Sequence, residues 1–136
     1  LVNMSFGLRS DRPVLREACE RADSAGVTLI AAAPARGDAV YPAAYPFVLR
    51  ATGDARCQVG EISFLGTDEV ACGGRVHFGG HVRCGDGRVA GASVGCAHVT
   101  RCALGLLLEN PGMDRARLYS ALVKRASYRG PERRSS

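Results

Sequence analysis

The sequence predicts an α/β protein built on a parallel sheet, and three observations support this fold class. Residues 27–33 form a continuous apolar run with β-branched members, which is typical of a strand buried on both faces. Residues 1–6 have the composition of the end of another strand, and a helical pattern lies between the two. Strand, helix and strand within about 30 residues predict a βαβ unit with a right-handed crossover.

The first predicted helix has signals at both ends. Ser10 and Asp11 supply a candidate N-cap, and Pro13 falls in the first turn, where its missing N–H breaks no helical bond. Gly26 is the C-terminal stop. The apolar residues at helical spacing, which we expect to face the sheet, are Val14, Leu15, Ala18, Cys19 and Ala22.

The middle of the chain predicts one more buried strand and then shorter pieces. Residues 47–52 form the third strand, after a loop that begins at Pro34. The following stretch is rich in glycine, with short alternating segments at 61–65, 75–78 and 81–83. These segments predict hairpins and irregular connections.

Two helices complete the predicted domain. Residues 94–108 form an apolar helix that Asn110-Pro-Gly112 stops, and residues 114–127 form an amphipathic one. In the last helix we expect Leu118, Leu122 and Val123 to face inward. The predicted domain covers residues 1–128, and residues 129–136 are expected to form a basic, flexible tail.

Charge and hydropathy exclude two classes of partner. The chain carries 18 Lys and Arg against 13 Asp and Glu, and residues 115–136 hold seven of the cations against one Glu. Because only Tyr119 and Tyr128 lie among these cations, few aromatic residues are available for base stacking, and we interpret the cations as a solvated face and expect no nucleic-acid partner. The longest apolar run is interrupted by polar residues and shorter than the ~18 residues of a membrane span, so we expect no membrane partner.

Six cysteines are many for 136 residues. The first residues show no signal-peptide pattern, so we expect reduced thiols and a cytoplasmic location. On predicted helical faces such thiols act as small apolar side chains. The six are Cys19, Cys57, Cys72, Cys84, Cys96 and Cys102.

The run Gly91-Ala-Ser-Val-Gly-Cys-Ala-His98 is the main candidate for chemistry. It ends the glycine-rich stretch and opens an apolar helix, which places the hydroxyl of Ser93 at a helix N-terminus. A turn of small residues presents the nucleophile in several hydrolases. Serine is also a common N-cap, and considered alone the run favours that interpretation.

A zinc site is the alternative from a different class. Cys72, His77, His81 and Cys84 offer four donors within thirteen residues. Tetrahedral zinc accepts two cysteines and two histidines, but this spacing matches no standard finger and contains no Cys-x-x-Cys. Surface histidines and incidental thiols are therefore favoured, and we expect neither a metal nor a cofactor.

Three segments carry a common pattern: Asn3-Met-Ser-Phe-Gly7, then Ala31-Ala-Ala33 followed by Tyr41-Pro-Ala-Ala-Tyr45, and finally the run that contains Ser93. Together they resemble the subtilisin-like serine proteases, the subtilases. The family has Asn-Met-Ser-hydrophobic-Gly, Ala-Ala-Gly-Asn, Tyr-Pro-Ala and Gly-Thr-Ser-Met-Ala-x-Pro-His-Val in this order. The resemblance covers residues 1–128 and implies the C-terminal part of a three-layer catalytic domain whose N-terminal strands lie outside this chain.

The resemblance assigns roles residue by residue. Ser93 falls on the nucleophile, and His98 on a structural histidine of the same helix that is not the catalytic base. The substrate backbone would lie in extended pairing along the first segment, and the second segment would line the pocket for the residue before the cut. The implied substrate-binding residues are Ser5, Phe6, Gly7, Ala31, Ala32 and Ala33.

Two departures leave two functions open. The family's catalytic Asp and His precede the Asn-Met-Ser strand, so both would come from sequence before Leu1. Pro34-Ala35 stands where the family has the Gly-Asn of its oxyanion hole. The sequence therefore predicts either a serine endopeptidase that processes a peptide or leader, similar to the small subtilases of quinohemoprotein amine dehydrogenase maturation, or a catalytically inactive module that binds peptides. The reading frame upstream of Leu1 would separate them.

Overall fold

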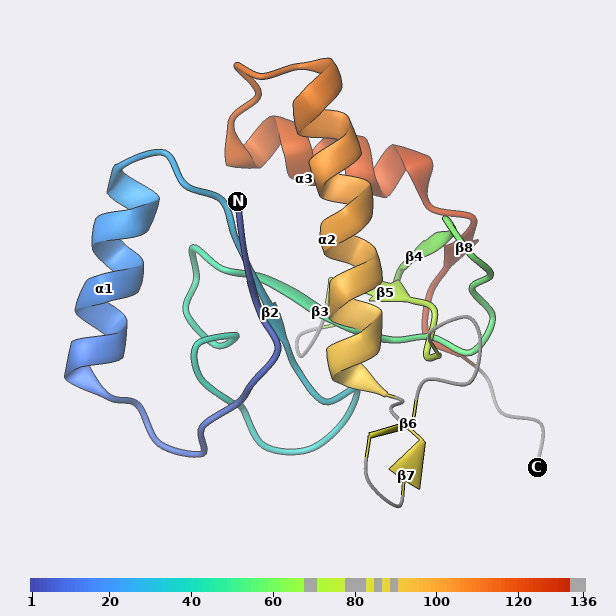
Figure 1. Cartoon of the computed structure of the whole chain (residues 1–136), viewed down its shortest axis with the longest axis horizontal. Helices are drawn as coiled ribbons and strands as arrows, with labels where there is room; N and C mark the ends of the chain where they lie inside the picture. The colour runs from blue at the N-terminus through green and yellow to red at the C-terminus, as the bar shows by residue number, and fades with distance from the viewer. Residues whose placement is uncertain (68–70, 78–82, 85–86, 89–90, 133–136) are drawn as a thin grey trace.

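Six strands form one sheet in the order β1-β2-β3-β5-β4-β8 in the computed structural model, which describes residues 1–67, 71–77, 83–84, 87–88 and 91–132 (Figure 1). The first four strands in this order run parallel, β4 is antiparallel to β5, and β8 is parallel to β4. A separate antiparallel pair, β6 and β7, precedes the second helix. The bounds are β1 Val2–Met4, β2 Leu29–Ala32, β3 Leu49–Gly53, β4 Ile62–Phe64, β5 Cys72–Gly74, β6 Arg83–Cys84, β7 Gly87–Arg88 and β8 Tyr128–Arg129.

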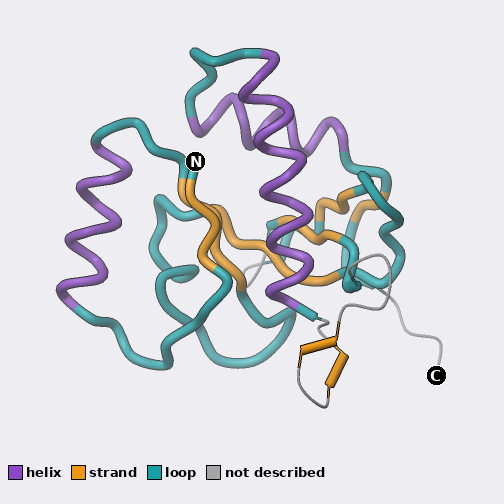
Figure 2. The backbone as a smooth tube through the Cα atoms, viewed as in Figure 1, coloured by secondary structure: helices purple, strands orange, loops and turns teal. Residues whose placement is uncertain are grey.

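Helices cover both faces of this sheet. Helix α1 (Pro13–Ser24) lies on one side, and α2 (Ala92–Glu109) and α3 (Arg115–Arg125) lie on the other (Figures 1 and 2). All four residues of β2 are buried because its side chains alternate between the two layers. Ile30 belongs to the core under α2 and α3, and Leu29 belongs to the core under α1. The predicted three-layer α/β fold is confirmed.

A glycine sets how closely α2 approaches the sheet. A Cβ built on Gly95 would lie 2.0 Å from the carbonyl oxygen of Thr52 in β3. Because no side chain fits into this space, only glycine allows the helix to rest directly on the strand. The first turn of α2 is therefore held above the carboxyl end of β3.

Two N-terminal predictions are corrected. The first helix begins at Pro13 with Arg12 as N-cap and no side-chain cap; Asp11 instead accepts hydrogen bonds from Arg16 and Tyr45. Val14, expected in the buried stripe, is 80% exposed, whereas Cys19 is buried. The stripe of α1 is narrower than predicted, because this helix contacts the sheet mainly along β2.

The C-terminal end also differs from its prediction. Tyr128 and Arg129 form β8 beside β4, and the N–H of Gly130 donates to the carbonyl of Phe64 at 2.9 Å. The predicted domain boundary at 128 thus falls inside a strand, and residues 133–136 of the predicted tail lie outside the described residues. Helix α3 has Asp114 as its N-cap, with its carboxylate accepting from the Arg117 N–H.

The glycine-rich stretch matches its prediction in part. Strand β4 lies within the predicted segment 61–65, but the next strand, β5, ends at Gly74, before the predicted segment 75–78. Residues 81 and 82 lie outside the described part of the chain. Among the helices described, none has the length and apolar character to span a bilayer.

Candidate active site at the start of helix α2

Ser93 is exposed in the first turn of α2 and does not cap the helix. The N-cap is Gly91, whose φ of 102° lies in the left-handed region that favours glycine. Ser93 is the second helical residue, and no side chain at this end makes a cap hydrogen bond. The N-cap interpretation of Ser93 is therefore wrong, and the hydroxyl is left for another role.

Ser93 meets the end of β1. Its Oγ donates to the carbonyl of Ser5 at 3.3 Å, and the Ser5 Oγ lies 3.5 Å from the carbonyl of Ser93. The two serines are 88 residues apart in the chain. The fold brings them together because β1 ends where α2 begins, at the carboxyl edge of the parallel strands (Figure 1). Ligand sites of open α/β sheets form at this edge.

The residues after β1 form an open rim. Ser5 and Gly7 are exposed, and Phe6 is 46% exposed. Leu8 pairs with Tyr41 through two backbone hydrogen bonds of 2.8 and 2.9 Å, which fastens this rim to the loop after β2. The rim therefore presents backbone groups beside Ser93 from a fixed position.

The three alanines of the predicted pocket separate in space. Ala31 and Ala32 are buried and belong to the two cores on opposite faces of the sheet. Ala33 lines a cavity of about 240 Å³ that the following loop encloses, with Pro34, Asp38 and others. The larger described cavity, about 590 Å³, lies between α3 and the β4–β5 turn, and none of the predicted site residues lines it.

His98 lies away from Ser93 on the same helix. A Cβ built on Gly74 would lie 3.0 Å from the His98 Cβ, so this side chain starts against β5. The spacing of five residues turns it to another face of α2. This placement agrees with a structural histidine.

The described residues do not support the zinc alternative. Cys72 is 1% exposed in the core, where burial raises the pKa of its thiol to about 12. A zinc ligand must be a thiolate, which this environment disfavours. His77 is exposed beyond β5, while His81 and the side chain of Cys84 lie outside the described residues. Within the described ranges, no three His, Cys, Asp or Glu side chains are grouped to hold a metal.

Asn3 is a site residue to which the sequence analysis assigned no role. Its Nδ2 donates to the Ser5 Oγ at 2.9 Å, and its Oδ1 accepts from Thr100 Oγ1 at 2.8 Å and from Cys96 Sγ at 3.1 Å. Two signals were present in the sequence: Asn3 and Ser5 share one face of a strand, and Cys96 and Thr100 are one helical turn apart. Only the fold shows that these faces meet.

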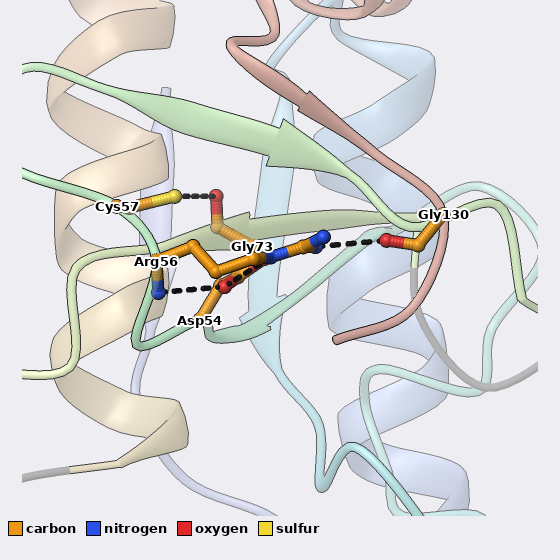
Figure 3. Close-up of polar contacts among 5 residues, drawn as sticks. All are labelled: Asp54, Arg56, Cys57, Gly73 and Gly130. Atoms are coloured by element: carbon orange, nitrogen blue, oxygen red, sulfur yellow. Dashed lines mark hydrogen bonds and ion pairs between the residues drawn. The ribbon is translucent and has the colours of Figure 1, made fainter. Parts of the chain in front are cut away.

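An ion pair between Asp54 and Arg56 is a second feature that the sequence analysis missed (Figure 3). Asp54 is 1% exposed and bonds Arg56 at 2.7 Å, and Arg56 donates on to the Gly130 carbonyl at 2.8 Å. Burial alone would raise the pKa of Asp54, but the hydrogen bonds from the side chain and backbone of Arg56 outweigh burial and hold it below its ordinary value.

The ion pair is linked to the start of α2 through the backbone of the preceding residue. A Cβ on Gly53, the residue before Asp54, would lie 2.9 Å from the carbonyl oxygen of Gly91, the N-cap of α2. The backbone of the ion pair therefore abuts the turn that presents Ser93. Asp54 is also held by its own N–H, which donates to Gly74 at 2.7 Å.

Comparison with known proteins supports the fold. No family model matches the chain, and no curated protein matches it. A solved structure named "S41 Psychrophilic Protease" is similar, with a TM-score of 0.62 and 22% sequence identity, over 92% of this chain and 48% of that chain. The chain thus shares the fold of a protease and spans about half of its length.

Proposed function

We propose that the chain is the nucleophile-bearing part of a serine endopeptidase of the subtilase type. The observation that carries the proposal is the exposed Ser93 in the first turn of α2, with its Oγ 3.3 Å from the Ser5 carbonyl at the end of β1. The order of the three sequence segments and the fold shared with a protease support the same function.

The proposed reaction is acyl transfer. The Ser93 Oγ attacks a peptide carbonyl carbon while an imidazole takes its proton, and that proton then passes to the leaving amine. Water releases the acyl group in the second half of the reaction. The developing oxyanion would be held by the Ser93 N–H at the positive end of α2. The imidazole and the carboxylate that orients it would come from polypeptide preceding Leu1.

The lack of a side-chain amide in the oxyanion segment is expected to lower the turnover rate. Pro34 and Ala35 supply no side-chain amide at the position of the family's oxyanion segment. Loss of one such donor lowers turnover by about 10²–10³ in a well-studied subtilisin. We therefore propose slow turnover, which suits processing of one peptide or leader rather than general digestion.

The exposed edge of the sheet at β1 supports the proposal that polypeptide preceding Leu1 packs against this part of the chain. Among the described strands, β1 ends the sheet, and Leu1 and Val2 are 38% and 41% exposed. On the neighbouring helix, Leu104 and Leu108 are 46% and 72% exposed. We propose that polypeptide preceding Leu1 covers these residues, since the protease of similar fold is about twice as long.

A peptide-binding module without catalysis is the second candidate. The Ser93 Oγ donates to a backbone carbonyl rather than to an imidazole, and the rim of Ser5, Phe6 and Gly7 offers exposed residues along which a peptide could pair. This module would bind the same peptides and leave them intact.

Peptide hydrolysis separates the two functions. The chain should be expressed together with the coding sequence that precedes Leu1 and incubated with a mixed peptide library. We expect cleavage that Ser93→Ala abolishes and that Ser120→Ala, at an exposed position on α3, leaves unchanged. Peptide retention without cleavage would contradict the endopeptidase and support the binding module.

A further inference from the structure

The side chain of Asn3 connects β1 to the second and third turns of α2. It donates to Ser5 and accepts from Cys96 and Thr100, at 2.9, 3.1 and 2.8 Å. The three partners of the amide are therefore Ser5, which contacts Ser93, and two residues that follow Ser93 on α2. Among the described residues of β1, Asn3 is the one whose side chain hydrogen-bonds to α2.

Strand and helix geometry place these contacts on one side of Ser93. Asn3 and Ser5 project from the same face of the chain, while Met4 between them packs into the opposite core. On the helix, Ser93, Cys96 and Thr100 are spaced by three and four residues and share a face. Asn3 therefore holds the same helical face that presents the nucleophile.

Gly95 and Asn3 constrain different movements of α2. The contact of Gly95 with the Thr52 carbonyl fixes how close the helix lies to the sheet. By itself this contact does not fix rotation about the helix axis, because glycine has no side chain to interlock. The hydrogen bonds of Asn3 oppose that rotation, and with it the movement of the Ser93 Oγ relative to the rim at Ser5.

The hydroxyl of Thr100 strengthens the connection. Its Oγ1 lies 2.8 Å from the Asn3 Oδ1 and 2.8 Å from the carbonyl of Cys96, and its single proton is shared between the two acceptors. Cys96 itself is fully buried, and burial raises the pKa of its thiol to about 12, so the thiol stays a neutral donor to Asn3. The network is therefore uncharged.

We infer that Asn3 is a positioning residue, which sets the rotation of α2 and thereby the direction of the Ser93 Oγ toward a bound peptide carbonyl. Asn3 touches neither the peptide nor the reacting atoms. The inference rests on the proposed function and deepens it, because it predicts loss of acylation rate with little loss of peptide binding.

The experiment uses the chain expressed with the coding sequence that precedes Leu1. A small fluorophosphonate reports the acylation rate of Ser93 without extended peptide binding, and peptide hydrolysis reports KM and kcat. The variants are Asn3→Ala and Thr100→Val, with Thr100→Ser as the matched variant that keeps the hydroxyl. Ile62→Val, in a buried position on β4, controls for a general loss of stability.

We expect Asn3→Ala and Thr100→Val to slow acylation by about 10- to 100-fold, the effect of a small misplacement of a reacting atom. KM should change by less than about threefold, since the ground-state peptide contacts remain. Thr100→Ser and Ile62→Val should keep the wild-type rate.

Three results would overturn the inference. Acylation of both Asn3→Ala and Thr100→Val at the wild-type rate would remove the positioning role while leaving the proposed function in place. Equal slowing by Ile62→Val would assign the effect to stability alone. A wild-type protein that no fluorophosphonate labels would overturn the proposed function, and the positioning role with it.

Discussion

Gly95 and Gly105 lie on the same helix in opposite surroundings. A Cβ on Gly95 would meet the Thr52 carbonyl at 2.0 Å, whereas nothing lies within 4 Å of a Cβ on Gly105. The obstacle at Gly95 is backbone of a central strand, which has no free space to move into. The two positions therefore separate the helix propensity of alanine from its steric cost.

We predict opposite effects on stability for these two glycines. Gly95→Ala should lower the free energy of unfolding by about 3 kcal/mol or more, as overpacking against rigid groups does. Gly105→Ala should raise it by roughly 0.5–1 kcal/mol through helix propensity. Urea denaturation measures both, and a Gly95→Ala midpoint equal to the wild type would contradict the close approach of α2.

The ion pair of Asp54 and Arg56 predicts a second effect at this scale. Arg56→Ala leaves a buried carboxylate without its partner, and we expect a loss of roughly 3 kcal/mol, the low end for buried pairs because the Arg56 side chain is 26% exposed. Arg115→Ala, which breaks an exposed pair with Asp23, should cost less than about 1 kcal/mol. Equal losses of unfolding free energy in the two variants would show that the Asp54 pair contributes no more to stability than an exposed pair.

The pH dependence of stability follows from the same carboxylate. The pKa of Asp54 in the folded protein is below its ordinary value of 3.8, so the folded state releases this proton more readily than the unfolded state. The stability that it contributes is complete above pH 3.8 and is lost as the pH falls through the folded pKa. Asp54→Asn should flatten the unfolding free energy in this acid range. A slope as steep as that of the wild type would assign the titration to other groups.

At the scale of elements, the three helices begin in three ways. Helix α1 begins with Pro13, α2 follows the left-handed Gly91, and α3 has the side-chain cap Asp114. Proline at the first turn was predicted from the sequence, because its effect is local. The glycine N-cap was not, since Ser93 two residues later offers the more familiar signal.

Strand β8 shows why short elements were missed. Tyr128 and Arg129 give no periodic signal, and their strand exists only because β4 lies beside them. Strand β2 was predicted well, since its unbroken apolar composition follows directly from burial on both faces. Pairing between distant segments is what the single sequence did not contain.

We predict that β8 stabilises the domain through Arg56. A chain that ends at Ser127 lacks the Gly130 carbonyl, so the guanidinium loses an acceptor in a partly buried position. The unfolding free energy should fall by about 1–3 kcal/mol relative to a chain that ends at Glu132 and keeps the strand. Equal denaturation midpoints for the two chains would show that β8 adds nothing to stability.

At the scale of the whole molecule, the sheet joins residues that the sequence placed far apart. The sequence identified Ser93 and the segment from Ser5 to Gly7 as one site, and the structure brings Ser5 and Ser93 into contact. It did not identify Asn3 or Asp54, whose roles depend on which strand and helix faces meet. The chain shares its fold with a protease and spans about half of that protein's length.

The most direct test of the account is fluorophosphonate labelling of Ser93, read as a mass increase on the peptide that contains it. We predict labelling of the chain expressed with its upstream coding sequence, no labelling after Ser93→Ala, and no labelling of the 136 residues alone, since a serine without a base is a poor nucleophile. Labelling of the 136 residues alone at the rate of the longer protein, or an unlabelled longer protein, would contradict the claim that Ser93 is a nucleophile completed by upstream residues.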